Sequence, residues 1–320
     1  MAHVESSDGG DAAAPLDRAA FDALYRTLSA RNPWGAADRR GALNYITSAH
    51  VVAAANEIRT GRTVSLAAPI EDWTGPDNPH PADHVMTGGA DPSAVAASGL
   101  SFATDRIRMN IHGDADSHID ALCHVIYDGQ LYNAVAADTI TAAGATQLSI
   151  DVARDGIVSR GVLLDIARLR GVTWIEPGDH VTAQDLAAAE RAQGVQVGEG
   201  DVLFVRVGHR RRRADLGPWD AARNRAGLHP SALDFVSERH VAVLGSDGNN
   251  DTAPSLVVGV GFPVHVLAIN AMGVHLLDYL ALWDLSEACA AEGRWSFLSV
   301  VAPLRMPTAT GSPVNPIAIL

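Results

Sequence analysis

Short apolar runs separated by helical segments constrain the fold of this 320-residue chain more than any other feature. Strand-like runs occur at 161–166, 201–207, 241–247 and 296–304. Helical spacing of apolar residues occurs among them at 182–193, 230–238 and 283–292. Strands that alternate with helices are typical of α/β or α+β proteins with a mixed sheet. We therefore expect a fold of this class.

The N-terminal part adds predicted helices at 16–29 and 49–59 and a predicted strand at 63–70. Residues 1–15 are small, acidic and rich in Gly and Ala, so we expect a mobile tail there. The remainder contains no internal repeat and no linker that would divide it. We therefore expect residues 16–320 to form a single domain.

Composition and charge limit the classes of partner. The chain has 37 acidic and 24 basic residues, a formal charge of −13 that argues against nucleic acid as the main partner. No run reaches the ~18 apolar residues of a membrane span, and the N-terminus lacks the features of a signal peptide. Cys123 and Cys289 cannot form a disulfide framework. We expect a cytoplasmic protein that acts on a small molecule.

Residues 110–125, NIHGDADSHIDALCHV, concentrate side chains that can bind metals. In an extended strand alternate side chains share one face, so five of these groups would project together. They are His112, Asp114, Asp116, His118 and Asp120. If a helix follows, His124 lies four residues after Asp120 and points the same way. The stripe would supply imidazoles and carboxylates for one or two divalent cations.

A polar strand that faces solvent is the alternative interpretation of this stripe. Such strands usually carry Lys, Glu, Thr and Ser, whereas here several Asp side chains would share one face, which costs energy unless a cation neutralises them. The chain also lacks the GxSxG, HExxH and GxxxxGK[ST] motifs of other catalytic classes. A metal site is therefore the favoured interpretation.

The HxDxxxH pattern at His118, Asp120 and His124 resembles the centre of the HxGTHxDxxxH signature of the cyclase superfamily, which includes bacterial kynurenine formamidases and isatin hydrolases. Blocks such as WGAADRRGALNYIT, GVLLDIARLRG and TGSPVNPIAIL extend the resemblance over roughly residues 33 to 320. It implies a swivelling β/β/α-type fold around a mixed, barrel-like sheet. It also implies a homo-oligomer, either a dimer or a tetramer.

The resemblance also implies roles for single residues. Asp114, His118 and Asp120 fall on the positions that bind a metal in the smaller formamidases, with Asp114 in place of the first His. His124, His265 and Asp278 fall on the second cluster, with Asp278 in place of Glu. These departures make the site richer in oxygen, which favours Mn²⁺ or a mixed preference over a strictly zinc site.

Two further groups of the stripe have open roles. His112 and Asp116 are either additional metal ligands or outer-shell groups. Whether one or two metals bind is also open.

These residues predict a metal-dependent hydrolase that opens an amide, a cyclic amide or a lactone by attack of activated water. His124 and His265, oriented by Asp278, would then be an acid/base pair or ligands of a second metal. Two alternatives keep the same site. One is an intramolecular cyclase or dehydratase of a biosynthetic pathway, and the other is a metal-stabilised binding protein without activity.

Four features outside the motif have competing interpretations. The Gly- and Pro-rich segment 71–101 is either a lid over the substrate or a surface excursion. The basic run 210–213 favours a solvated or ion-paired corner over a phosphate site. We expect His275 to be a core residue and Asp247 to belong to a turn.

Overall fold

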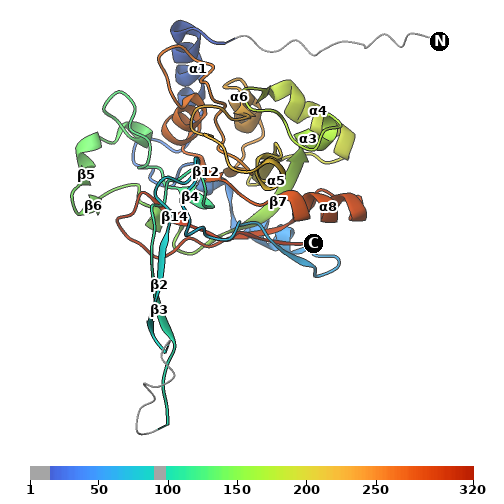
Figure 1. Cartoon of the computed structure of the whole chain (residues 1–320). Helices are drawn as coiled ribbons and strands as arrows, with labels where there is room; N and C mark the ends of the chain where they lie inside the picture. Colours follow the sequence, from blue (N-terminus) through green and yellow to red (C-terminus); the bar gives the residue numbers. More distant parts are fainter. Residues whose placement is uncertain (1–14, 90–98) are drawn as a thin grey trace, which may run out of the picture.

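The computed structural model describes residues 15–89 and 99–320, and it contains a nine-stranded sheet (Figure 1). The predicted tail therefore lies almost entirely outside the described residues. The strands run across the sheet in the order β1 (Thr63–Ser65), β15 (Ile317–Ile319), β13 (Ser296–Val301), β7 (Ile157–Asp165), β9 (Val202–Arg206), β11 (Val243–Ser246), β12 (His275–Asp278), β4 (His118–Asp120) and β14 (Gly311–Pro313).

The centre of this sheet is parallel and its flanks are antiparallel. Strands β7, β9, β11 and β12 pair in parallel, whereas β13 and β4 pair antiparallel to their inner neighbours. Helices occupy the crossovers: α3 (Ile166–Leu169) and α4 (Ala183–Gln193) precede β9, and α5 (His209–Leu216) and α6 (Ala232–Glu238) precede β11. The prediction of an α/β fold with a mixed sheet is confirmed.

Local sequence signals explain why these elements form. Every residue of β9 is buried, as expected for a strand covered on both faces. Helix α4 begins at a capping box in which Thr182 and Asp185 satisfy each other's backbone N–H groups. It ends at Gly194, whose φ of 63° suits the left-handed C-cap. The remaining long helices are α1 (Arg18–Ala30), α2 (Ser48–Ala55) and α8 (Trp283–Glu292).

The sheet curls rather than ending as a flat layer. Leu66 follows the edge strand β1, and its carbonyl accepts a 2.7 Å hydrogen bond from Ala281 N, beyond the end of β12. Ala67 also forms a β-bridge with Leu280. The chain after the edge strand thus returns to the other side of the sheet, which gives the barrel-like form expected from the resemblance.

Smaller elements complete the fold. The segment before β12 consists of α7 (Pro263–His265) and a π-helix, η5 (Val266–Met272). Short 3₁₀-helices are η1 (Gly41–Tyr45), η2 (Tyr132–Ala134), η3 (Ala137–Thr139) and η4 (Ile150–Ala153), and two-residue strands are β5 (Ile140–Thr141), β6 (Gly144–Ala145), β8 (His180–Val181) and β10 (Gly227–Leu228). Across the described residues, no helix combines the length and apolar character needed to cross a membrane.

A two-stranded arm, β2 (Asp83–Gly88) paired with β3 (Thr104–Arg108), projects from the body of the molecule (Figure 1). All of β3 and most of β2 are exposed to solvent. The described part of segment 71–101 therefore includes one strand of an arm that points away from the body. None of the described residues of this segment lines the cavity that contains His118, so β2 fits the interpretation as a surface excursion.

Candidate functional site

The site is built where β4 and β12 lie side by side in the sheet. These strands pair antiparallel with His118 opposite Asp278, so residues 160 apart in sequence become neighbours. His118 and Asp120 share one face of β4, and His118 Nε2 lies 3.6 Å from Asp120 Oδ1. All three side chains are buried.

The residues before β4 do not continue the strand. The prediction that 112–120 forms one extended stripe is wrong, because only His118–Asp120 is a strand and residues 110–117 form a loop. This loop nevertheless brings His112 back to the site, where its Nδ1 lies 2.8 Å from Asp120 Oδ1.

His124 reaches the same cluster from a turn rather than from the predicted helix. Its backbone N–H donates to Ala121 O at 2.9 Å, which closes a tight turn after β4. Its ring stacks on the ring of His112 with 3.7 Å between the centroids. The two imidazoles therefore face the cavity together.

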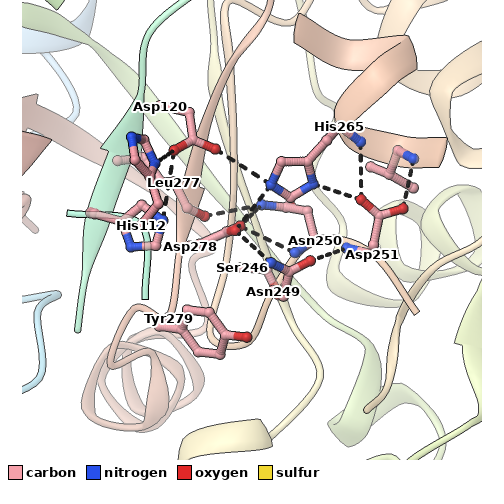
Figure 2. A network of polar contacts seen from close by, with 12 residues as sticks. His112, Asp120, Ser246, Asn249, Asn250, Asp251, His265, Leu277, Asp278 and Tyr279 are labelled. Carbon is pink, nitrogen blue, oxygen red and sulfur yellow. Dashed lines mark hydrogen bonds and ion pairs between the residues drawn. The ribbon is translucent and has the colours of Figure 1, made fainter. Parts of the chain in front are cut away.

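His265 approaches from the opposite side, at the junction between α7 and the π-helix (Figure 2). Its Nε2 lies 3.4 Å from Asp120 Oδ2 and 3.3 Å from Asp278 Oδ2. Its Nδ1 contacts Asp251 Oδ2 at 2.6 Å. Asp251, rather than Asp278, therefore holds the far side of this ring.

The cluster shifts the acidity of its members in opposite directions. Burial acts to raise the pKa of Asp120, but the surrounding imidazoles outweigh it and hold that pKa well below its usual value. Burial lowers the pKa of His124 to about 4. Burial also acts to lower the pKa of His265, but the three carboxylates around it raise that pKa well above its usual value.

These groups meet a geometric test for a metal centre. Two sets of side chains each bring their ligand atoms within 4.8 Å of one another. One set is His112, Asp120 and His124, and the other is His118, Asp120 and Asp278. Asp120 belongs to both sets, and its buried Oδ2 accepts no hydrogen bond from any described residue. Such an orphaned carboxylate oxygen beside several imidazoles fits a divalent cation.

A cavity of about 550 Å³ opens over the cluster. Its polar floor contains His112, Asp114, His118, His124, Asn249, His265 and Asp278, and its other walls include Val125, Ile126, Val260, Phe262 and Val266. Asp120 lies beneath this floor and is fully buried. A cavity with apolar walls and a few convergent polar groups is the usual form of a small-molecule site.

Two predicted ligands lie apart from both candidate metal sets. Asp114 lines the cavity, but its Oδ1 accepts a 2.5 Å hydrogen bond from the Tyr279 hydroxyl. Asp116 is buried and accepts a hydrogen bond from the backbone N–H of Glu71. The resemblance grouped Asp114 with His118 and Asp120, whereas in the structure it is His112 that lies beside Asp120, together with His124.

Three supporting residues, Asn249, Asn250 and Asp251, were missed by the sequence analysis. Asn249 Nδ2 donates to Asp278 Oδ2 at 2.9 Å, and Asn250 donates to Asp278 Oδ1 from both its backbone N–H and its amide (Figure 2). The available signal was the GNND run (248–251) directly after the strand-like 241–247, where polar side chains at a strand end mark a site.

The basic run proves to be helix α5, and two of its arginines are largely buried. Arg213 pairs with Glu71 and Asp77, in agreement with the ion-paired interpretation. Arg210 donates to Tyr279 O and to Ala115 O, and thereby ties the loop before β4 to the end of β12.

The two residues assigned to background roles lie outside the cavity. Asp247 is buried and accepts hydrogen bonds from Val207 N and Gly208 N, so it ties the end of β11 to the end of β9 rather than forming the local turn that was predicted. His275 is completely buried, as expected for a core residue.

The family model described as "Putative cyclase" matches residues 49–250, more than half of the chain. The crystal structure of a novel cyclase is 33% identical with a TM-score of 0.81, and the match covers 92% of this chain and 99% of that one. Among curated proteins, no sequence matches the chain.

Two isatin hydrolase structures share the fold at lower identity. One, bound to the product analogue thioisatinate, is 18% identical with a TM-score of 0.57 and covers 86% of this chain and 99% of its own. The other, from Labrenzia aggregata and bound to benzyl benzoate, is 20% identical with a TM-score of 0.57 and covers 80% and 93%. The family match and the 33% identical structure together confirm the resemblance: the chain belongs to the cyclase family.

Proposed function

We propose that the protein is a metal-dependent hydrolase that opens an amide, a cyclic amide or a lactone. The observation that carries this proposal is the convergence of four imidazoles and the Asp278 carboxylate at one cavity, around a buried Asp120 whose Oδ2 lacks a hydrogen bond. The isatin hydrolases and a protein from Bacillus stearothermophilus described as a predicted metal-dependent hydrolase, which share the fold, are in keeping with it.

Asp120 would hold the cation, either with His118 and Asp278 or with His112 and His124, because within each of these two sets the ligand atoms lie within 4.8 Å of one another. When bound, a divalent cation polarises a carbonyl group and acidifies coordinated water. Imidazoles suit Zn²⁺ and carboxylates suit Mn²⁺, so the mixed set supports either ion.

The remaining groups would manage protons and the substrate. His265 carries an imidazole whose Nε2 faces the cluster, which places it to exchange a proton with the leaving group. Val260, Phe262 and Val266 form an apolar wall that would receive the body of the substrate and limit the access of water.

The decisive experiment combines metal analysis with a substrate panel. Purified protein, stripped and reloaded with Mn²⁺ or Zn²⁺, is assayed on lactones, cyclic amides and N-acyl aromatic amides beside an Asp120→Asn variant. Metal-dependent ring opening or amide cleavage that the variant lacks supports the proposal. Ring closure on the open-chain forms would instead indicate a cyclase, and bound metal without turnover would indicate a binding protein.

A further inference from the structure

Asp251 makes an unusual set of contacts for a residue outside the cavity. It is fully buried and accepts three hydrogen bonds, two from the backbone N–H groups of Val264 and His265 and one from the His265 ring. The ring contact is the shortest of the three, at 2.6 Å between Nδ1 and Oδ2. Figure 2 shows Asp251 on the side of His265 opposite Asp120 and Asp278.

The position of Asp251 determines which ring atom of His265 faces the site. Because Nδ1 donates to Asp251, Nε2 is the nitrogen directed at Asp120 and Asp278, at 3.4 and 3.3 Å. A flipped ring would place a carbon atom against a buried carboxylate and leave that oxygen unsatisfied. The carboxylate therefore selects one orientation of the imidazole.

We propose that Asp251 is a positioning residue that fixes the His265 imidazole with Nε2 directed into the candidate metal centre. The inference rests on the proposed function for its catalytic consequence, whereas the orientation of the ring can be tested without turnover. Buried carboxylates that orient functional imidazoles are a recurring device, and loss of such a partner typically costs about 10- to 100-fold in activity or metal affinity.

A purely structural role must be distinguished from positioning, since Asp251 also caps the start of α7. Asp251→Ser removes the carboxylate and with it both the ring contact and the two backbone contacts, so it measures the combined loss. Asp251→Asn keeps the size of the side chain and removes its charge.

Asp247→Asn is the matched control. Asp247 is equally buried and also accepts two backbone N–H groups, from Val207 and Gly208, but it contacts no imidazole of the site. A loss of kcat that is caused only by a missing acceptor for backbone N–H groups in the core would appear in this variant too.

The first measurement is NMR of the full-length protein labelled with ¹⁵N-histidine, with and without Zn²⁺. The wild type is expected to show a strongly deshielded ring N–H from His265, assigned by its absence in His265→Gln. This resonance should disappear in Asp251→Ser and Asp251→Asn and remain in Asp247→Asn. Its retention in both Asp251 variants would overturn the proposed orientation.

The second measurement separates kcat from KM on the best substrate of the panel. Both Asp251 variants should lose about 10- to 100-fold in kcat with KM nearly unchanged, while Asp247→Asn keeps its kcat. Unchanged kcat in a variant that has lost the resonance would overturn the positioning role. If no substrate is turned over by the wild type, the proposed function fails, and the NMR result alone then decides the orientation.

Discussion

Two of the histidine–carboxylate pairs in the structure have similar separations but opposite surroundings. On the arm, His84 Nε2 lies 2.8 Å from Asp105 Oδ2, with side chains 49% and 60% exposed. In the site, His265 and Asp251 are 2.6 Å apart, with side chains 7% and 0% exposed. Exposed ion pairs contribute little to the stability of a protein because water competes for both partners. Burial, and the two further carboxylates that face His265, distinguish the site from the arm.

Burial alone does not make a histidine functional. His275 lies ten residues after His265 and is completely buried, yet neither of its ring nitrogens has a hydrogen-bond partner among residues 15–89 and 99–320. Burial lowers the pKa of His275 to about 4, whereas the carboxylates around His265 raise its pKa. The chemistry of the site thus depends on burial combined with acidic neighbours.

The largest expected effect is loss of metal from the buried cluster. His118→Ala removes an imidazole whose Nε2 lies 3.6 Å from Asp120 Oδ1, and should weaken Mn²⁺ or Zn²⁺ binding by more than about 100-fold, since even outer-shell losses reach that size. Metal analysis after dialysis measures the change. His84→Ala, the same substitution on the arm, should keep wild-type stoichiometry. Equal metal content in the two variants would contradict the proposed centre.

The second prediction uses Asp278 to distinguish a single-metal site with a proton relay from a site that binds two metals. We favour the single-metal site, because three hydrogen bonds from Asn249 and Asn250 already engage the Asp278 carboxylate. Asp278→Asn should then keep its metal and lose about 10²- to 10⁴-fold in kcat. Titration with Zn²⁺ and steady-state kinetics measure the two quantities.

A second tightly bound equivalent of metal in the wild type, lost in Asp278→Asn, would refute the single-metal version. Full activity of the variant would refute a role for Asp278 in either version.

The third prediction uses His275 to test what burial does to a histidine whose ring has no hydrogen-bonded carboxylate among the described residues. Its pKa is about 4 in the folded protein and about 6.5 in the unfolded chain, so between these values the unfolded chain binds more protons. Stability should therefore fall as the pH drops through this window. His275→Leu should remove about 2 kcal/mol from the fall in the free energy of unfolding between pH 7 and pH 4.5.

Urea unfolding at the two pH values measures this difference. His84→Leu is the control and should leave the pH dependence of the free energy of unfolding as in the wild type. A His275→Leu variant with the wild-type pH dependence would contradict the assigned cause.

The smallest expected effect is on the arm itself. A double-mutant cycle of His84→Ala and Asp105→Ala should give a coupling energy below about 1 kcal/mol, because both side chains are half exposed. Urea unfolding at pH 6 measures it. A larger coupling would show that the arm is shielded from water in solution and would remove the contrast with the buried pair.

Local patterns in the sequence predicted most elements of the sheet and the centre of the site. His118 and Asp120 share a face because strand side chains alternate, and α4 lies where its capping residues indicate. The family was also accessible from the HxDxxxH pattern and the blocks around it. These features depend on neighbours within a few residues, so a single sequence carries them.

Only the tertiary structure decided which side chains complete the site. The alternation rule placed Asp114 and Asp116 beside Asp120, but the chain before β4 is a loop that presents His112 instead and leaves Asp114 with Tyr279. The contact of Asp251 with His265 likewise depends on where the chain after β11 meets the start of α7. Such contacts arise from the packing of separate elements, which leaves no periodic trace in the sequence because each partner is positioned by a different part of the fold.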